Sequence, residues 1–367
     1  MSDFSRLVVG CMTGTSIDAL DTALVRILGR GVAMRAEMVR TRSRPLGALG
    51  PRLRSLADQH PMTAGQIATL AHEFALFHAA TIADLLDGED PPDLIAVHGQ
   101  TVFHAPPVSW QMFNGAVLAH ELNVPVVFDL RAADLAAGGQ GAPITPLADW
   151  ILFRSALPTA VLNLGGFANA TLLPASEPGS DPSAAIDAIQ GFDICACNHL
   201  LDRIARELLG RPFDEGGAIA LSGTAHPGAR DDLALTLSSQ SRAGRSLGTG
   251  DETARWLDRW RAECSPSDLG AAACEAIAGA ITPRLADVRA ILVAGGGAHN
   301  GALVRAIEQH SGTPIAPTSS RGVPIEFREA AEMAVLGALC QDRVPITLAR
   351  VTGVPMPAPI AGVWAGL

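Results

Sequence analysis

The sequence contains no lysine, so all 27 of its basic residues are arginines. They are outnumbered by 37 acidic residues, and the formal net charge is −10. An acidic chain without basic runs is a poor nucleic-acid binder. We therefore expect no nucleic-acid partner, and an anionic ligand would have to be met by arginine side chains, backbone N–H groups or a metal ion.

Long apolar runs are also missing. No run of about 18 apolar residues occurs, so no membrane partner is expected, and the first apolar run is too short for the core of a signal peptide. The six cysteines show no paired metal-binding spacing, because Cys195 and Cys197 form Cys-x-Cys without a second pair or a histidine cluster. We expect reduced cysteines and a cytoplasmic location.

The length and the apolar content indicate more than one core. The chain has 367 residues, of which 48% are hydrophobic and 17% are charged. A chain of this length usually divides into two domains.

The chain is organised around a glycine turn near its beginning. Residues 7–9, and then Leu24, Val25 and Ile27, are apolar and rich in β-branched side chains, as in buried strands. A glycine turn between them can form an anion nest of backbone N–H groups, flanked by hydroxyls and by carboxylates that suit Mg²⁺. The sequence favours a phosphate-binding hairpin here, although an ordinary hairpin turn fits equally well. The candidate phosphate-binding residues are Gly14, Thr15, Ser16, Ile17, Asp18, Ala19, Leu20 and Asp21.

The same plan of strand and glycine-rich turn recurs along the chain. A helix is predicted over residues 63–86, a buried strand over 94–97, a loop over 174–185 and a helix over 198–209. Glycine-rich turns follow predicted strands near residues 14, 165 and 296. Because ligands of α/β sheets bind beyond the carboxyl ends of strands, these turns predict a nucleotide held across a cleft between two lobes.

Five segments together resemble the anhydro-N-acetylmuramic acid kinase family, which belongs to the sugar-kinase/Hsp70/actin superfamily. The segments span residues 12–18, 98–104, 138–143, 163–169 and 295–300, and the resemblance runs from about residue 7 to about residue 340. It implies an α/β fold of two ribonuclease-H-like lobes with an interlobe cleft. We expect an N-terminal lobe of residues 1–128 with about 345–367, and a C-terminal lobe of residues 129–344.

The resemblance also implies a reaction and its residues. Members of the family hydrolyse the anhydro ring of 1,6-anhydro-N-acetylmuramic acid and phosphorylate O6 with ATP, in cell-wall recycling. The family's catalytic base falls on Asp193 in this sequence, and Mg²⁺ would be held by Asp18 directly or through water. Further ATP contacts fall on Gly165, Gly166, Gly295, Gly296 and Gly297, and sugar contacts on His98, Gln100, Arg131 and Glu329. The family often forms homodimers.

The sequence departs from the family at the base. Two glycines and a threonine that usually follow the catalytic Asp are replaced in the stretch Ile194, Cys195, Ala196 and Cys197. A further segment of the family's sequence pattern is also altered here, and Gly244 and Arg245 are its only residues that can be clearly matched. An active kinase, a catalytically impaired paralogue that binds nucleotide or sugar, and a kinase of another sugar therefore stay open. Simpler roles are also considered: Asp193 as a helix cap, His98 as a structural histidine, and Cys195 and Cys197 as core residues.

Overall fold

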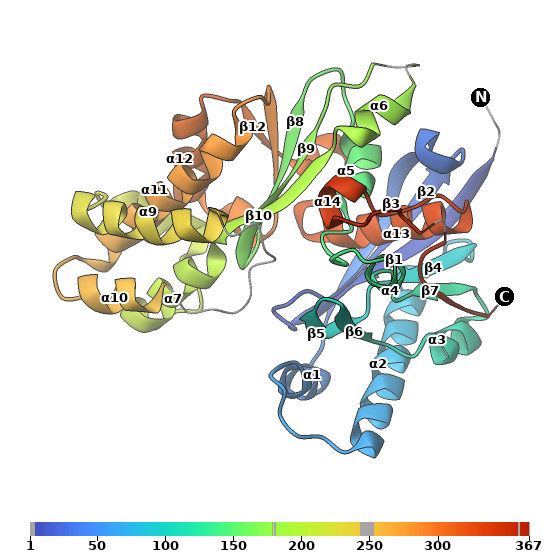
Figure 1. Cartoon of the computed structure of the whole chain (residues 1–367). Helices are drawn as coiled ribbons and strands as arrows, with labels where there is room; N and C mark the ends of the chain where they lie inside the picture. Colours follow the sequence, from blue (N-terminus) through green and yellow to red (C-terminus); the bar gives the residue numbers. More distant parts are fainter. Residues whose placement is uncertain (1–3, 178, 180, 243–252, 359, 367) are drawn as a thin grey trace. The chain divides into compact units, whose positions relative to one another are not determined.

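The computed structural model describes residues 4–177, 179, 181–242, 253–358 and 360–366. Gly244 and Arg245 lie outside the described residues. The chain divides into two units (Figure 1). Unit 1 is Met1–Arg154, Asp181–Ile189 and Gly322–Leu367, and unit 2 is Ser155–Ser180 and Gln190–Arg321.

Unit 1 is built on a six-stranded sheet in the order β13-β7-β4-β1-β2-β3. The hairpins β1–β2 and β2–β3 are antiparallel, whereas β4 pairs in parallel with β1 and with β7. The strands are β1 (Ser5–Met12), β2 (Ala19–Leu28), β3 (Arg35–Pro45), β4 (Leu94–Val97), β7 (Val126–Phe128) and β13 (Val363–Ala365), with a separate ribbon of β5 (Gln100–Ala105) and β6 (Val108–Met112).

The helices of unit 1 come from three separate parts of the chain. They are α1 (Leu49–Ala57), α2 (Ala64–Leu85), α3 (Gly115–Leu122), α4 (Ala132–Ala136), α5 (Pro146–Phe153), α6 (Pro182–Asp187), α13 (Arg328–Gln341) and α14 (Ala349–Thr352), with 3₁₀ turns η1 (Gly31–Ala33) and η6 (Ile325–Phe327). Helix α13 is almost entirely buried and packs on β1, β2 and β4. For this reason the expected boundary at residue 128 and the assignment of 129–344 to one lobe do not match the observed units.

Unit 2 has a five-stranded sheet in the order β10-β9-β8-β11-β12. The strands are β8 (Thr159–Leu164), β9 (Phe167–Leu173), β10 (Gln190–Ala196), β11 (Ala290–Ala294) and β12 (Ile315–Pro317). The first three are antiparallel neighbours, and β11 pairs in parallel with β8 and β12. Taken in chain order, this is the arrangement 3-2-1-4-5, which is also found in unit 1 before β13 is added. The expected ribonuclease-H-like fold of both halves is therefore confirmed.

The core of unit 2 lies between one face of its sheet and a layer of helices (Figure 1). The helices are α7 (Asn198–Leu209), α8 (Ala218–Ser222), α9 (Pro227–Arg242), α10 (Ala254–Trp260), α11 (Pro266–Ile281) and α12 (Gly301–Ser311), with 3₁₀ turns η2 (Glu215–Gly217), η3 (Thr282–Leu285), η4 (Gly296–His299) and η5 (Thr318–Arg321). Trp256 and Trp260, four residues apart on α10, are both buried in this core.

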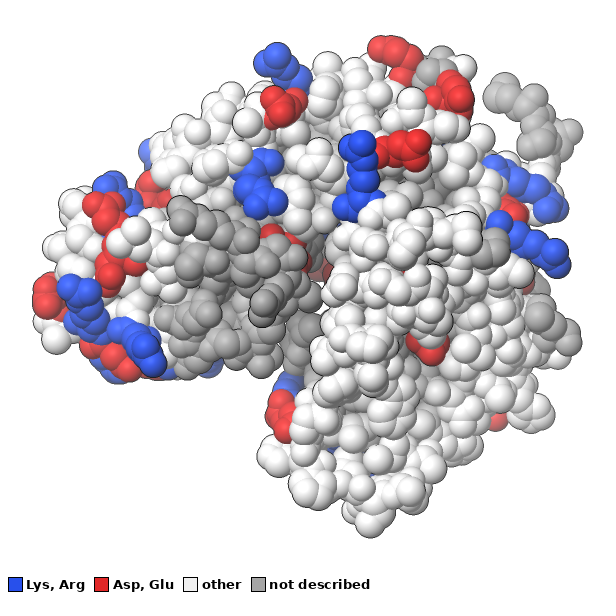
Figure 2. Space-filling model, viewed as in Figure 1, with Lys and Arg blue, Asp and Glu red and all other residues white. Residues whose placement is uncertain are grey.

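Charged side chains are scattered over the face drawn in Figure 2, with positive and negative groups often adjacent and no broad patch of one sign among the described residues. Several arginines pair with carboxylates, as Arg40 does with Glu89 and Arg203 with Glu207. In the part of the chain that the structure describes, no helix has the length and apolarity needed to cross a membrane.

Candidate active site

The first glycine turn lies between β1 and β2. Ile17 adopts a positive φ of 51° and its backbone N–H donates to the carbonyl of Gly14. Ile17 and Leu20 are buried in the core of unit 1, whereas Thr15, Ser16 and Asp18 are exposed. A phosphate at this turn would therefore meet backbone N–H groups and hydroxyls, not the side chains of Ile17 or Leu20.

Asp18 and Arg54 hold the turn in shape. The Oδ1 atom of Asp18 accepts hydrogen bonds from the Ser16 hydroxyl at 2.6 Å and from the backbone N–H of Ala19 at 3.0 Å. Arg54, on α1, donates to the carbonyls of Ser16 at 2.6 Å and Ile17 at 3.3 Å. The sequence did not indicate Arg54, because nothing in the local pattern shows that α1 returns to the turn.

Acidic side chains of unit 1 gather around Asp21. Burial raises the pKa of Asp21 to about 6, and the negative charges of Asp18, Glu329 and Glu326 add to the effect, while a hydrogen bond with Ser43 opposes it. Glu329 was expected near the sugar, whereas Glu326 in η6 was not singled out. Two segments distant in the sequence, residues 18–21 and 326–329, thus place four carboxylates in one electrostatic neighbourhood.

This neighbourhood is not a preformed metal cage. Among the described residues no group of three or more histidine, cysteine or acidic side chains is arranged to hold a metal ion. The carboxylate oxygens of Asp18 and Asp21 do fit Mg²⁺ chemically, because Mg²⁺ commonly takes one or two protein carboxylates and completes its shell with water and substrate phosphates.

His98 and Arg131 form a second cluster in unit 1. The Nε and Nη2 atoms of Arg131 both donate to Nε2 of His98, at 3.1 and 3.0 Å. Because a guanidinium can only donate, Nε2 must be an acceptor, so Nδ1 carries the proton and donates to the carbonyl of Gly99 at 2.8 Å. Burial and the Arg131 charge lower the pKa of His98 to about 3. His98 is therefore a neutral partner of Arg131.

Gln100 lies beside this cluster at the start of β5. It is 1% exposed, and its Nε2 atom donates to the carbonyl of Thr101 at 3.2 Å. Its Oε1 atom has no hydrogen-bond partner among the described residues. A buried amide oxygen in this state suits a ligand or water that completes it.

In unit 2 the turn between β8 and β9 contains Gly165 and Gly166. Their carbonyls accept from the first backbone N–H groups at the start of α7: Gly166 from Cys197 at 2.9 Å and Gly165 from Asn198 at 3.0 Å. A Cβ atom on Gly166 would lie 2.4 Å from Nε2 of His199, so a larger residue would require the His199 ring to move. The turn is thus tied to the end of the strand that carries Asp193.

The turn after β11 meets the β8–β9 turn. Gly295 has φ +79°, and a Cβ atom there would lie 2.6 Å from Oδ1 of Asn163. A Cβ atom on Gly297 would lie 2.8 Å from Oδ1 of Asn198. The glycines at 165–166 and 295–297, far apart in the sequence, therefore meet at the carboxyl ends of β8 and β11.

A row of polar residues crosses the sheet of unit 2 at this edge. Asn163 pairs with Asn169, and Asn169 pairs with Asp193, in the registers of β8, β9 and β10. Paired residues share a face of a sheet. Leu162 and Ala168, their sequence neighbours, belong to the helix-covered core, so the polar row lies on the opposite face.

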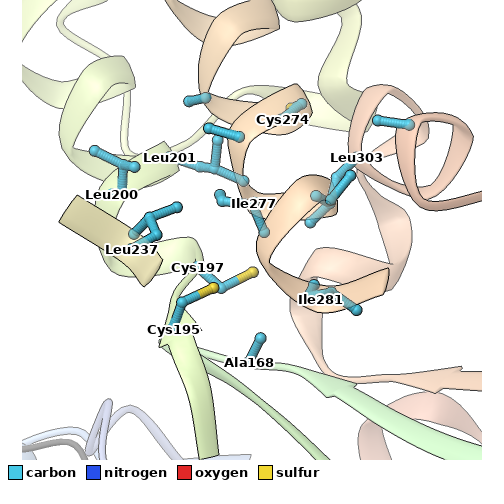
Figure 3. Packing of buried hydrophobic residues seen from close by; sticks show 14 of the residues in the cluster. Ala168, Cys195, Cys197, Leu200, Leu201, Leu237, Cys274, Ile277, Ile281 and Leu303 are labelled. Atoms are coloured by element: carbon cyan, nitrogen blue, oxygen red, sulfur yellow. The ribbon is translucent and has the colours of Figure 1, made fainter. Parts of the chain in front are cut away.

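The altered stretch after Asp193 is part of the core. The register of β10 shifts between Asp193 and Cys195, and residues 194–197 are all 5% exposed or less. Figure 3 shows the side chains of Cys195 and Cys197 directed into the cluster formed with residues of α7 and α11. Burial raises the pKa of the Cys195 thiol to about 12, so this thiol stays neutral. The interpretation of the two cysteines as core residues is confirmed.

A glycine pair that the sequence analysis passed over lies near the third turn. Gly216 and Gly217 have positive φ values of 64° and 68°. A Cβ atom on Gly217 would lie 2.1 Å from Oδ1 of Asn300, while Asp214 accepts from the backbone N–H groups of Ile219 and Ala220 at 2.9 Å. The sequence signal for this turn is an acidic pair followed by a glycine pair, residues 214–217, ahead of an apolar stretch.

Two ribonuclease-H-like units, with glycine turns at the ends of their first strands, define a protein of the sugar-kinase/Hsp70/actin class. Within this class, the family model described as anhydro-N-acetylmuramic acid kinase matches residues 6–364. The chain belongs to that family.

Curated relatives cover nearly the whole chain. An anhydro-N-acetylmuramic acid kinase of Bordetella parapertussis is 36% identical over 95% of this chain and 93% of its own length. A protein of the same name from Salinibacter ruber is 33% identical over 97% of this chain and 95% of its own. Among solved structures, an activator of a 2-hydroxyisocaproyl-CoA dehydratase from Clostridium difficile with bound ADPNP is similar, with a TM-score of 0.47 and 14% identity, covering 92% of this chain and 95% of its own.

Proposed function

We propose that this chain is an ATP-dependent kinase that hydrolyses the anhydro ring of 1,6-anhydro-N-acetylmuramic acid and phosphorylates O6. The product is N-acetylmuramic acid 6-phosphate, an intermediate of cell-wall recycling. The observation that carries the proposal is the family match over residues 6–364, supported by relatives of that name at 33 to 36% identity.

Asp193 is the proposed general base. Water is a weak nucleophile, so a positioned carboxylate must take its proton as the oxygen attacks C1 and the C1–O6 bond breaks. The freed O6 attacks the γ-phosphorus of ATP, the bond to the β-phosphate oxygen breaks, and ADP leaves. The position of Asp193 in a polar row, on the face opposite the apolar core, supports this role.

The glycine turns are the proposed nucleotide contacts. Residues 14–21 would bind phosphate through backbone N–H groups and through the hydroxyls of Thr15 and Ser16. Gly165 and Gly166 would contact the phosphates, and residues 295–297 the adenosine. Mg²⁺, when bound with ATP, would neutralise phosphate charge, and Asp18 would hold it directly or through water.

Arg131 is the proposed principal contact to the sugar. His98 accepts from Nε and Nη2 of Arg131 and so fixes the plane of the guanidinium. Gln100, whose Oε1 atom has no hydrogen-bond partner in the described part of the chain, and Glu329, in the acidic neighbourhood of Asp21, would contribute further polar contacts.

A coupled ADP-release assay with MgATP and 1,6-anhydro-N-acetylmuramic acid tests the proposal. We expect sugar-dependent ADP release by the natural chain and a decrease of at least ~100-fold in Asp193→Asn, as the loss of a general base predicts. Asp231→Asn is the matched control, because Asp231 is exposed on α9 of the same unit and should leave the rate unchanged.

The other outcomes distinguish the alternatives. ATP binding without turnover in a folded natural chain would indicate an impaired paralogue. ADP release with a different sugar only would indicate another substrate. Full activity of Asp193→Asn would assign the base elsewhere.

The proposal extends to a cytoplasmic enzyme that acts on a free sugar, without a nucleic-acid or membrane partner. The acidic, lysine-free composition supports the lack of a nucleic-acid partner. The family resemblance further implies a homodimer, which light scattering during size-exclusion chromatography would test.

A further inference from the structure

A loop rich in glycine wraps around a buried carboxylate in unit 1. Asp134 is 1% exposed, and its Oδ2 atom accepts from the backbone N–H of Gly141 at 2.7 Å. A Cβ atom on Gly139 would lie 2.1 Å from the same oxygen, so only glycine allows the loop to pass so close. The carboxylate is therefore the centre on which the loop is shaped.

The other oxygen of Asp134 binds a residue that lies 218 positions later in the sequence. The hydroxyl of Thr352, in α14, donates to Oδ1 of Asp134 at 2.8 Å. The carbonyl of Thr352 accepts from the backbone N–H of Gln140 at 2.8 Å, and the side chain is fully buried. Thr352 thus binds both the carboxylate and the loop around it.

This loop in turn binds the arginine that faces the proposed sugar. The carbonyl of Gly141 accepts from Nη1 of Arg131 at 2.7 Å. Its N–H donates to Asp134, so Gly141 links the carboxylate on one side to Arg131 on the other. With His98 binding Nε and Nη2, the guanidinium is oriented from two directions.

We propose that Asp134 and Thr352 are positioning residues for Arg131, so that α14 sets sugar affinity without touching the sugar. The proposal rests on the proposed function, in which Arg131 binds the sugar. Loss of the Thr352 hydroxyl leaves a buried carboxylate oxygen without its donor, and the loop relaxes to satisfy it. Arg131 then loses its fixed orientation.

The test is Thr352→Val, which keeps the shape of the side chain but removes the hydroxyl, with Thr352→Ser as the variant that restores it. We expect the KM for the sugar to rise about tenfold in Thr352→Val, equivalent to one lost hydrogen bond of ordinary strength. The KM for ATP should stay unchanged, and Thr352→Ser should approach the natural chain. Asp134→Asn removes one of the two carboxylate acceptors, so it should also raise the KM for the sugar and leave the KM for ATP unchanged. This variant replaces Thr352→Val in the test if Thr352→Val fails to fold.

Thr81→Val is the matched control. Thr81 is also fully buried in unit 1, but its hydroxyl donates to a carbonyl of its own helix, that of Phe77. A rise in both KM values, a change confined to kcat, or equal effects of Thr81→Val and Thr352→Val would overturn the proposal.

A second readout is independent of turnover. Nitrogen-15 spectra of the histidine rings, with His98 assigned by His98→Gln, should show the Nδ1–H tautomer in the natural chain and mixed tautomers in Thr352→Val. An unchanged His98 spectrum would overturn the positioning role. If the natural chain does not phosphorylate this sugar, the proposed function fails, and these spectra still decide whether Thr352 orients Arg131.

Discussion

Asp21 shows how the surroundings of one residue set its chemistry in this protein. Its carboxylate is largely buried and lies near Asp18, Glu326 and Glu329, and its pKa is raised to about 6. A carboxyl group with a raised pKa binds its proton more tightly in the folded than in the unfolded chain. Stability is then lost as the pH rises from the unfolded pKa through the folded pKa.

The corresponding prediction concerns Asp21→Asn, which cannot ionise. From about pH 4 to about pH 7, the free energy of unfolding of the natural chain should fall relative to that of the variant by about 1–2 kcal/mol, a value reduced for partial exposure. Urea unfolding, monitored through the hydrogen exchange of peptides from unit 1, measures this difference. Asp87→Asn, at an exposed site, should show the pH dependence of the natural chain; a pH-independent difference for Asp21→Asn would contradict the assigned cause.

The contact between β1 and α13 shows what an element requires of a single position. A Cβ atom on Gly10 would lie 1.9 Å from the carbonyl oxygen of Ala330 and 2.5 Å from the backbone nitrogen of Ala334. Both neighbours are backbone atoms of a buried helix, so no side chain can move aside. Glycine at this position allows α13 to lie directly on the strand that precedes the first glycine turn.

Gly10→Ala should therefore destabilise unit 1 by about 3 kcal/mol or more, because the helix must shift away from the sheet. Gly65→Ala is the control: it lies in the first turn of α2 with open space around its Cβ position, and should be neutral or stabilising by up to about 1 kcal/mol. Urea unfolding of both variants measures the contrast. Equal stabilities would mean that α13 can be displaced without cost.

Elements with strong local signals could be predicted from the sequence. Helix α2 begins as predicted, because the side chain and backbone of Thr63 exchange hydrogen bonds with Gln66 in a capping box. Elements that depend on distant contacts were missed, including α1, α9 and the β5–β6 ribbon. The predicted loop over residues 174–185 contains the start of α6, whose N-cap is Asp181.

In the candidate site, too, residues with a local signal could be predicted and residues that depend on distant contacts could not. The glycine turns and Asp193 could be found from residue types and the family resemblance, because local conformation demands glycine and the family motif supplies the position of the Asp. The row of Asn163, Asn169 and Asp193 could not, because it depends on strand register and on the bulge before Cys195. Arg54, Glu326 and Thr352 reach their partners only through the tertiary fold.

At the scale of the whole molecule, each unit has an apolar core of its own among the described residues. Leu53, on α1, is fully buried in the core of unit 1, and Ile277, on α11, is fully buried in the core of unit 2. Each core is enclosed by its own sheet and helices. A cavity made in one core removes contacts from that unit alone, so the two units should lose stability separately.

Leu53→Ala and Ile277→Ala test this prediction as a matched pair. Each truncation of a buried aliphatic side chain should cost about 2–5 kcal/mol. Hydrogen exchange read by mass spectrometry should show faster exchange in β1, β2 and β4 for Leu53→Ala, and in β8, β9 and β11 for Ile277→Ala, with the other unit unchanged in each case. If either variant accelerates exchange equally in both units, the chain unfolds as one cooperative body, and the stability of each glycine turn then depends on both cores.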